Sequence, residues 1–244
     1  MKLHVVNHKD YFAKIGDDHK FPINKFAELA KYLLNKKIVK NFHEPYSCSN
    51  ETLKKAHSEI YITQIKNKTL GKDGVRKIGF PLTESVVQRS LVATGGTVLA
   101  SKLAIKNGLS CNTAGGSHHA NFNEGAGYCV FNDVAVAAHY LLDRGLASKI
   151  LIIDLDVHQG NGNSDIFRDN KNVFTFSMHS KSNYPAKKSI SDLDVELADN
   201  MEDKEYLKIL KFYLNQLNKE NFDYVFYLAG VDFHFNDRLG KFYI

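Results

Sequence analysis

The chain has 244 residues, of which 43% are hydrophobic and 24% are charged, and it contains four prolines. This length and composition exclude a disordered or fibrous protein and favour a globular one with a sizeable core. The formal net charge is +5, and the basic residues are scattered along the chain. Without a clustered basic face or a reading motif, nothing predicts direct binding to nucleic acid.

Cysteine usage and apolar runs indicate the compartment and the domain organisation. Cys48, Cys111 and Cys129 are too widely spaced for a disulfide framework or a Cys-x-x-Cys metal clip, which favours a reducing compartment. The N-terminus, MKLHVVNHKDYF, lacks the apolar stretch of a signal peptide, and no other run has the length of a membrane span. We therefore expect a cytoplasmic protein without membrane contact.

No repeat or linker divides the chain, so we expect one domain over residues 1–244, of undetermined oligomeric state.

Apolar runs of strand length alternate with helical segments along the chain. Strands are expected at Leu3–Val6, Lys149–Leu155, Val173–Met178 and Phe222–Ala229. Helices are expected over Thr83–Lys106, ended by Gly108, from Asn132 or Asp133 to Gly145, and over Glu202–Asn218. The run KILIIDLD is apolar without alternation, as in a strand that is covered on both faces. This order predicts an α/β fold, a three-layer α/β/α sandwich with a mostly parallel sheet.

Three of the predicted strands run directly into polar segments. KILIIDLD continues into VHQGNG, VFTFSM continues into His179, and DYVFYLAG continues into VDFHFNDRLG. In open parallel sheets, ligands bind outside the carboxyl ends of the strands. We therefore expect a functional site where these segments meet.

The segment Asp154-Leu-Asp156-Val-His158 carries candidate metal ligands. In extended backbone, these three polar side chains share one face, and two buried carboxylates need a positive partner such as a divalent metal ion. Carboxylate and imidazole ligands without thiolate suit Zn2+, and they also suit Fe2+, cobalt or manganese. Asp232, whose small neighbours let the backbone approach closely, is the predicted third ligand. Three protein ligands with open coordination positions are typical of a catalytic metal site.

The glycine-rich segment GGSHHA adds two adjacent histidines, His118 and His119. One imidazole of near-neutral pKa can take a proton from water at the metal, and the other can stabilise developing charge or pass the proton on. Asp154 can serve His118 as the carboxylate that fixes the tautomer of its ring. Adjacent histidines, or one Asp-x-His step, more often have a structural role when they occur alone. The prediction of an active site therefore rests on their combination.

Five motifs occur in the same order and at similar spacing as in a known family. Between Pro81 and Gly240 the chain contains GGSHHA, GAGYCVFNDVAVAA, IIDLDVHQGNG, FSMHS and LAGVDFHFNDRLG. This succession resembles the histone deacetylases and the related amidohydrolases of the arginase/deacetylase fold. SMHSKSNYP and SDLDVEL are most similar to the class IV branch or its bacterial counterparts. The resemblance implies a zinc-dependent amidohydrolase that removes acyl groups from lysine in a protein or from a small amine such as a polyamine.

The resemblance also implies roles for individual residues. Asp156, His158 and Asp232 correspond to the zinc ligands, and His118 and His119 to the tandem catalytic histidines. Asp154 corresponds to the partner of His118. Asn161 stands where many members have the aspartate that partners the second histidine, and an amide there makes His119 less basic than a carboxylate would. Gln159 stands where a histidine is common.

A substrate channel and a second cation site follow from the same resemblance. Gly127 and Tyr128 are expected to line one wall of the acyl-lysine channel, and Tyr184 the other. A monovalent cation such as K+ is expected at the backbone carbonyls of Asp154, Asp156, His158, Ser177 and Met178. Gly79 stands near the position at which some members have a channel-rim aspartate.

The family's sequences continue past the DRLG motif to further strands and to a Gly-Gly-Tyr motif whose tyrosine polarises the scissile carbonyl. The present sequence ends at Ile244, so we expect an incomplete domain, an exposed sheet edge and a rate lower by roughly a hundredfold or more. The alternative function is therefore a weakly active or inactive deacetylase-like protein, either a binding module or a decayed gene product. An arginase-like dinuclear manganese hydrolase would need more bridging carboxylates than the sequence offers.

Overall fold

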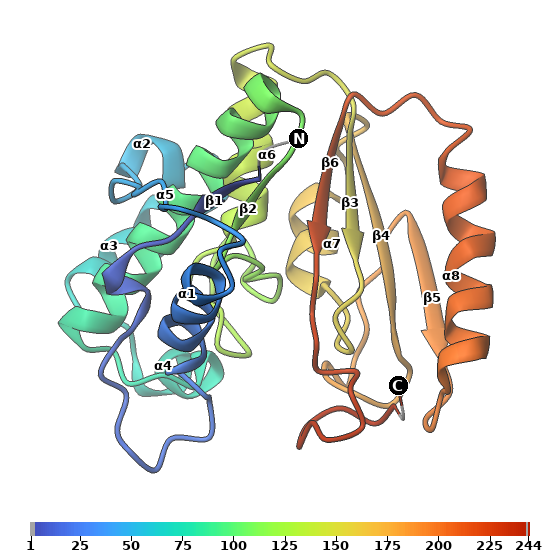
Figure 1. Cartoon of the computed structure of the whole chain (residues 1–244). Helices are drawn as coiled ribbons and strands as arrows, with labels where there is room; N and C mark the ends of the chain where they lie inside the picture. The colour runs from blue at the N-terminus through green and yellow to red at the C-terminus, as the bar shows by residue number, and fades with distance from the viewer. Residues whose placement is uncertain (1–2, 243) are drawn as a thin grey trace. The chain divides into compact units, whose positions relative to one another are not determined.

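The computed structural model describes residues 3–242 and 244 (Figure 1). The chain forms two compact units, Met1–Leu146 and Ala147–Ile244, and the position of one relative to the other is not determined. The expected single domain over residues 1–244 stays a prediction.

The first unit is mostly helical, and the second contains a larger sheet. The elements of the first unit are β1 (His4–Val6), the 3-10 helix η1 (Lys9–Tyr11), α1 (Lys25–Asn35), α2 (Asn50–Leu53), α3 (Glu59–Lys66), α4 (Lys72–Ile78), α5 (Glu84–Asn107), β2 (Ser110–Asn112) and α6 (Asp133–Asp143). Those of the second unit are β3 (Ile150–Asp154), α7 (Asn161–Phe167), β4 (Val173–Ser180), β5 (Leu193–Leu197), α8 (Asp203–Leu217) and β6 (Tyr224–Leu228).

Helices α5 and α6 pack together in the first unit, and their ends lie within a few residues of those that the sequence predicts. The Thr83 side chain accepts a hydrogen bond from Val86 N–H at the start of α5, and Gly108 follows its end with φ +84°. That left-handed conformation suits glycine and ends a helix. Asn132 caps α6 by accepting from Ala135 N–H at 2.8 Å. Beside α5, β1 and β2 form a parallel pair.

The buried ring of His57, a residue just before α3, is hydrogen-bonded to the segment that precedes α6. Its Nε2 accepts a hydrogen bond from Asn132 N–H at 2.8 Å, so its Nδ1–H donates to the Asn121 carbonyl at 2.9 Å. The side chain is fully buried, and burial lowers its pKa to about 4. The ring is therefore neutral near pH 7 and holds the loop between Asn121 and Asn132 through both nitrogens.

The second unit is built on a four-stranded sheet in the order β5-β4-β3-β6, in which every pairing is parallel. One face carries a core of apolar side chains under α8, whereas α7 lies on the other side of the sheet (Figure 1). The members of this core that come from the strands and α8 include Leu151, Phe176, Met178, Val195, Tyr206 and Leu217. Parallel strands with helices on both faces confirm the predicted α/β class with a mostly parallel sheet.

Four predicted strands and three predicted helices are present, with ends that differ by a few residues. The structure adds β2, β5, η1, α1 to α4 and α7, for which no element was predicted. Among the described residues, no helix combines the length and the apolar character needed to cross a membrane.

Replacing His57 with glutamine should make the free energy of unfolding depend less on pH under acidic conditions. Because the pKa of His57 is lowered on folding, the unfolded chain binds a proton between about pH 6.5 and 4 and the folded chain does not. The contribution of His57 to the free energy of unfolding is therefore complete above about pH 6.5 and is lost as the pH falls to about 4. The loss attributable to His57 is on the order of 3 kcal/mol across the window. Urea unfolding of wild type and His57→Gln at several pH values measures it. Parallel profiles for the two proteins would contradict the assignment.

Candidate metal centre

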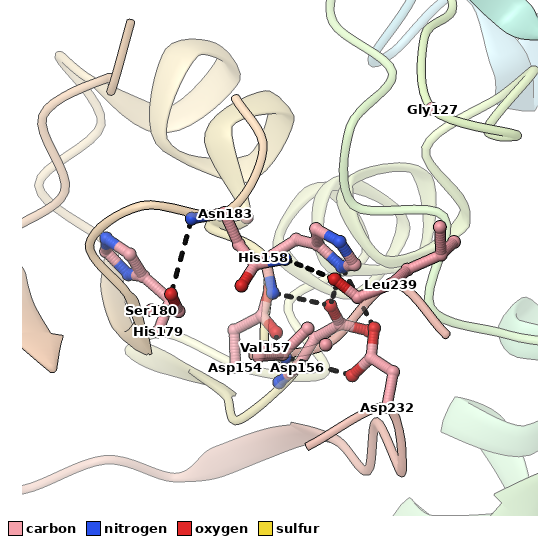
Figure 2. A network of polar contacts seen from close by, with 12 residues as sticks. Gly127, Asp154, Asp156, Val157, His158, His179, Ser180, Asn183, Asp232 and Leu239 are labelled. Atoms are coloured by element: carbon pink, nitrogen blue, oxygen red, sulfur yellow. Dashed lines mark hydrogen bonds and ion pairs between the residues drawn. The ribbon is translucent and has the colours of Figure 1, made fainter. Parts of the chain in front are cut away.

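Three predicted metal ligands lie together beyond the carboxyl ends of β3 and β6 (Figure 2). The Nδ1 atom of His158 is 2.9 Å from Asp156 Oδ1 and 2.9 Å from Asp232 Oδ2. One potential ligand atom from each residue lies within 4.8 Å of the others, and no second group of this kind occurs among residues 3–242. All three side chains are partly buried.

Side-chain acceptors bend the backbone that carries the first two ligands. Strand β3 ends at Asp154, whose Oδ1 accepts from Asp156 N–H at 3.2 Å. Asp156 Oδ1 in turn accepts from His158 N–H at 2.9 Å. Aspartate commonly forms such hydrogen bonds to the residue two positions ahead, and they favour turns. The expectation that extended backbone runs through His158 is therefore wrong, because successive turns bring Asp156 and His158 together.

The third ligand reaches the cluster because a glycine precedes it. A Cβ atom on Gly230 would lie 2.6 Å from the Cα of Asp156 and 2.8 Å from its Oδ2, closer than real Cβ atoms approach. Asp232 Oδ1 also accepts from Val157 N–H at 3.0 Å, which fixes the carboxylate beside the bend. The prediction that small neighbours of Asp232 permit a close backbone approach is confirmed at Gly230.

The electrostatics of the cluster favour a cation. Burial opposes protonation of His158, but hydrogen bonds and charge from Asp156 and Asp232 outweigh it and raise its pKa to about 10. Burial also raises the pKa of the Asp232 carboxyl, although His158 acts in the opposite direction. Without another cation, the carboxylates therefore hold an imidazolium. Two carboxylate oxygens and one imidazole nitrogen are a donor set that fits a divalent ion such as Zn2+ with open positions.

Asp154 and Asn161 lie outside the group of three. Asp154 is 2% exposed, and Gly160 packs against it so closely that a Cβ there would lie 2.1 Å from Asp154 Oδ2. Asn161 begins α7, and its N–H donates to the Gln159 carbonyl at 2.8 Å. Their predicted roles as partners of the two histidines stay predictions.

In the first unit, the two adjacent histidines are buried and in mutual contact. His118 and His119 are 3% and 5% exposed, and their ring centroids lie 4.0 Å apart. The loop before them is anchored by the fully buried Asp133, whose carboxylate accepts from Gly116 N–H at 3.1 Å and from Ser117 N–H at 2.7 Å. Asp133 was expected only as an alternative start of α6, and its bonds to Gly116 and Ser117 were not predicted.

The predicted channel residues of the first unit occupy an unusual turn. Gly127 and Tyr128 both have positive φ values, +54° and +64°, and a Cβ on Gly127 would lie 2.6 Å from His119 Cδ2. Positive φ is uncommon for a residue as large as tyrosine and is often found at functional sites. The Tyr128 ring packs against Phe21 and Phe80, with ring centroids 5.2 and 5.3 Å away. This turn therefore brings the Gly127 backbone against His119 and packs the adjacent Tyr128 ring on other aromatic side chains.

Tyr184 belongs to the second unit and lies in the loop between β4 and β5. Its side chain is 44% exposed, and its carbonyl accepts from Gln159 N–H at 3.3 Å. The structure thus brings together Asp156, His158 and Asp232 in one unit, and His118, His119 and Gly127 in the other. The predicted convergence of these two groups on one site stays a prediction.

The comparisons with known proteins identify the family. The chain matches the histone deacetylase domain over residues 19–244. It is 45% identical to an uncharacterized protein of Picosynechococcus sp., a match that covers 99% of this chain and 81% of that protein. It is 33% identical to histone deacetylase 2 of Arabidopsis thaliana, over 94% of this chain and 62% of the relative. The chain belongs to the histone deacetylase family.

More distant matches agree in fold. The acetoin utilization protein AcuC of Staphylococcus aureus is 26% identical to this chain, and the match covers 93% of this chain and 64% of AcuC. The chain thus spans a little under two thirds of the plant and staphylococcal relatives. A crystal structure of an HDAC homolog complexed with SAHA has a TM-score of 0.88 at 24% identity, and covers 100% of this chain and 72% of its own. The fold is therefore the arginase/deacetylase-like α/β fold of that family.

Replacing Gly230 with alanine should abolish divalent metal binding without unfolding the chain. The added Cβ cannot lie 2.6 Å from the Asp156 backbone, so Asp232 must move away from Asp156 and His158. We expect the rise in melting temperature on addition of Zn2+ to disappear. Gly71→Ala is the matched control, because a Cβ at Gly71 meets nothing within 4 Å. An unchanged zinc-induced shift in Gly230→Ala would contradict the steric argument.

Proposed function

We propose that this chain is a zinc-dependent amidohydrolase that removes acetyl or other acyl groups from lysine side chains or small amines. The observation that carries the proposal is the cluster of Asp156, His158 and Asp232 at the carboxyl ends of parallel strands. Membership of the histone deacetylase family and the similarity to a plant histone deacetylase support a deacetylase activity. The wide spacing of Cys48, Cys111 and Cys129 in the sequence supports the further proposal of a reducing, cytoplasmic setting.

The cluster would hold the metal ion through two carboxylates and one imidazole. When bound, Zn2+ supplies Lewis acidity that polarises an amide carbonyl and makes water nucleophilic near neutral pH. Fe2+ suits the same donors. The chain's own contribution is to fix the three donors, since backbone N–H groups of Val157 and His158 already orient both carboxylates.

The paired histidines are proposed to manage the proton and the developing charge. His119 takes a proton from the attacking water and His118 stabilises charge or relays the proton to the leaving amine. Both rings are buried. Asp154 is the proposed partner of His118, and Asn161 that of His119. Because Asn161 offers an amide, His119 would be a weaker base than in members with an aspartate there.

The proposed substrate channel has aromatic walls. Tyr128, next to Gly127, and Tyr184 would flank the aliphatic stem of an acylated lysine or amine, which suits the apolar faces of tyrosine rings. A monovalent cation such as K+ is proposed at the backbone carbonyls around Asp154 and Ser177, as in the family. The class of substrate is therefore an acylated primary amine on a slender stem.

The direct test is turnover by purified protein. A fluorogenic acetyl-lysine peptide and an acetylated polyamine are each incubated with metal-free protein and with protein reconstituted with Zn2+ or Fe2+. We expect amine release that depends on the metal and saturates with one of the two substrates. Stoichiometric zinc binding without release from either substrate would refute the enzyme proposal and favour a metal-holding binding module.

Alanine variants should separate metal binding from turnover. Asp232→Ala and His158→Ala each remove a donor, so they should lose bound zinc and activity together. His119→Ala should keep one zinc per chain, while turnover falls by roughly a hundredfold or more because the general base is gone. Elemental analysis of the dialysed proteins and steady-state assays make the comparison. Equal loss of zinc in all three variants would refute this division of roles.

A further inference from the structure

We propose that Gln159 is a positioning residue that ties the loop of residues 181–192 to the segment carrying the metal ligands. This loop connects β4 to β5 and carries Tyr184, the proposed channel wall. The inference rests on the proposed function for its consequence in substrate binding, but the tether itself is a property of the second unit alone. Gln159 directly follows His158, yet its side chain is fully buried and bonded to the loop.

The carboxamide of Gln159 uses both of its polar atoms. Its Nε2 donates to the Ser189 carbonyl at 2.9 Å, while its Oε1 accepts from Ser189 N–H at 2.8 Å. The same Nε2 donates its second hydrogen to Asp194 Oδ1 at 2.9 Å. The side chain thus pairs with one loop residue as a second backbone strand would. Buried polar groups satisfied in this way hold a segment in a single arrangement.

Asp194 extends the tether to the far end of the loop. Its Oδ2 accepts from Ser191 N–H at 2.8 Å, and its Oδ1 accepts from the Ser191 hydroxyl at 2.9 Å. Ser191 Oγ also lies 2.7 Å from Ser164 Oγ on α7. The residues just before β5 are therefore held to Gln159 and to α7 at once.

The near end of the loop is held through backbone groups. Gln159 N–H donates to the Tyr184 carbonyl, and Lys188 Nζ donates to the carbonyls of Asn183 and Pro185 at 2.6 and 2.7 Å. The loop therefore closes on itself around Lys188 and is fastened on both sides of Tyr184. The ring of Tyr184 remains 44% exposed, so what is fixed is the backbone that presents it.

Only an amide of this length satisfies all three contacts. Glutamate would lose both donors and would bring a second carboxylate against Asp194. An imidazole cannot offer a donor and an acceptor side by side to one peptide unit. The glutamine that replaces the family's common histidine is thus matched to Ser189 and Asp194 of this chain. We infer that it fixes the position of Tyr184 and thereby the fit of the acylated substrate, leaving the metal cluster unchanged.

The first experiment compares Gln159→Glu with Gln216→Glu, the same change at an exposed position on α8. With zinc-reconstituted protein and the acetyl-lysine peptide, Gln159→Glu should raise KM by roughly tenfold, since a broken buried polar contact loosens the loop. The value of kcat should change by less than about threefold, and one zinc per chain should remain. Gln159→Met, which removes the polar contacts without adding charge, should raise KM in the same direction.

A rescue variant separates a specific tether from general damage. In Gln159→Glu/Asp194→Asn, the amide and the carboxylate exchange places, so a donor again faces an acceptor between these two positions. We expect the KM of this double variant to lie between the raised KM of Gln159→Glu and the KM of wild type. No recovery, a fall in kcat at unchanged KM, or loss of zinc from Gln159→Glu would each overturn the proposal.

The loop itself gives a readout that needs no activity. Lys187 is exposed within the tethered segment, so cleavage after it by trypsin reports loop opening. Gln159→Glu and Gln159→Met should be cut there at least several times faster than wild type and Gln216→Glu. Equal cutting rates would overturn the tether. If wild type releases no amine from the peptide, the proposed function has failed, and the trypsin comparison alone decides the tether.

Discussion

The second unit is organised around one electrostatic constraint, the presence of two partly buried carboxylates, Asp156 and Asp232, on the same imidazole. Like charges at such short range are tolerated only with a cation between them, and His158 meets this need by holding a proton. A divalent metal ion satisfies the same constraint with the same donor atoms. The chain must then keep three side chains at fixed places, and much of the surrounding backbone serves that purpose. The close packing of Gly230 on Asp156 is the clearest instance.

Buried side chains that bond to backbone are the means by which this protein holds its loops. Asp133 accepts from two successive backbone N–H groups ahead of His118, His57 joins two separate segments through both ring nitrogens, and Gln159 pairs with Ser189. Each bond is worth about 1 kcal/mol in net stability, but leaving either partner unpaired in the interior costs more. Moving one of these loops would leave buried polar groups unpaired, and the free-energy cost of that holds the loops in place as much as the hydrogen bonds do.

Local sequence signals predicted the parts of the structure that depend on local chemistry. The strand at Ile150–Asp154 follows from an unbroken apolar run, and α5 and α6 begin and end at the predicted Thr83, Gly108 and Asn132. Strand β5, LDVEL, went unpredicted because a short alternation of apolar and acidic residues is a weak signal without its neighbour β4. The grouping of Asp156, His158 and Asp232 was predicted, although turns rather than extended backbone bring two of them together. Asp133 and Gln159 were missed as anchors because their partners are 16 or more residues away in sequence.

The neutrality of Gln159 matters because of where it stands. Gln159 directly follows His158, and a second imidazole at position 159 would add another titratable group and another metal donor next to the cluster of Asp156, His158 and Asp232. The amide holds the Tyr184 loop, and it neither binds a proton nor competes for a metal ion. The metal donors and the loop tether thus occupy adjacent positions of one segment without sharing chemistry. Position 159 therefore contributes neutral hydrogen-bonding groups to the loop, while the neighbouring cluster holds the charged donors.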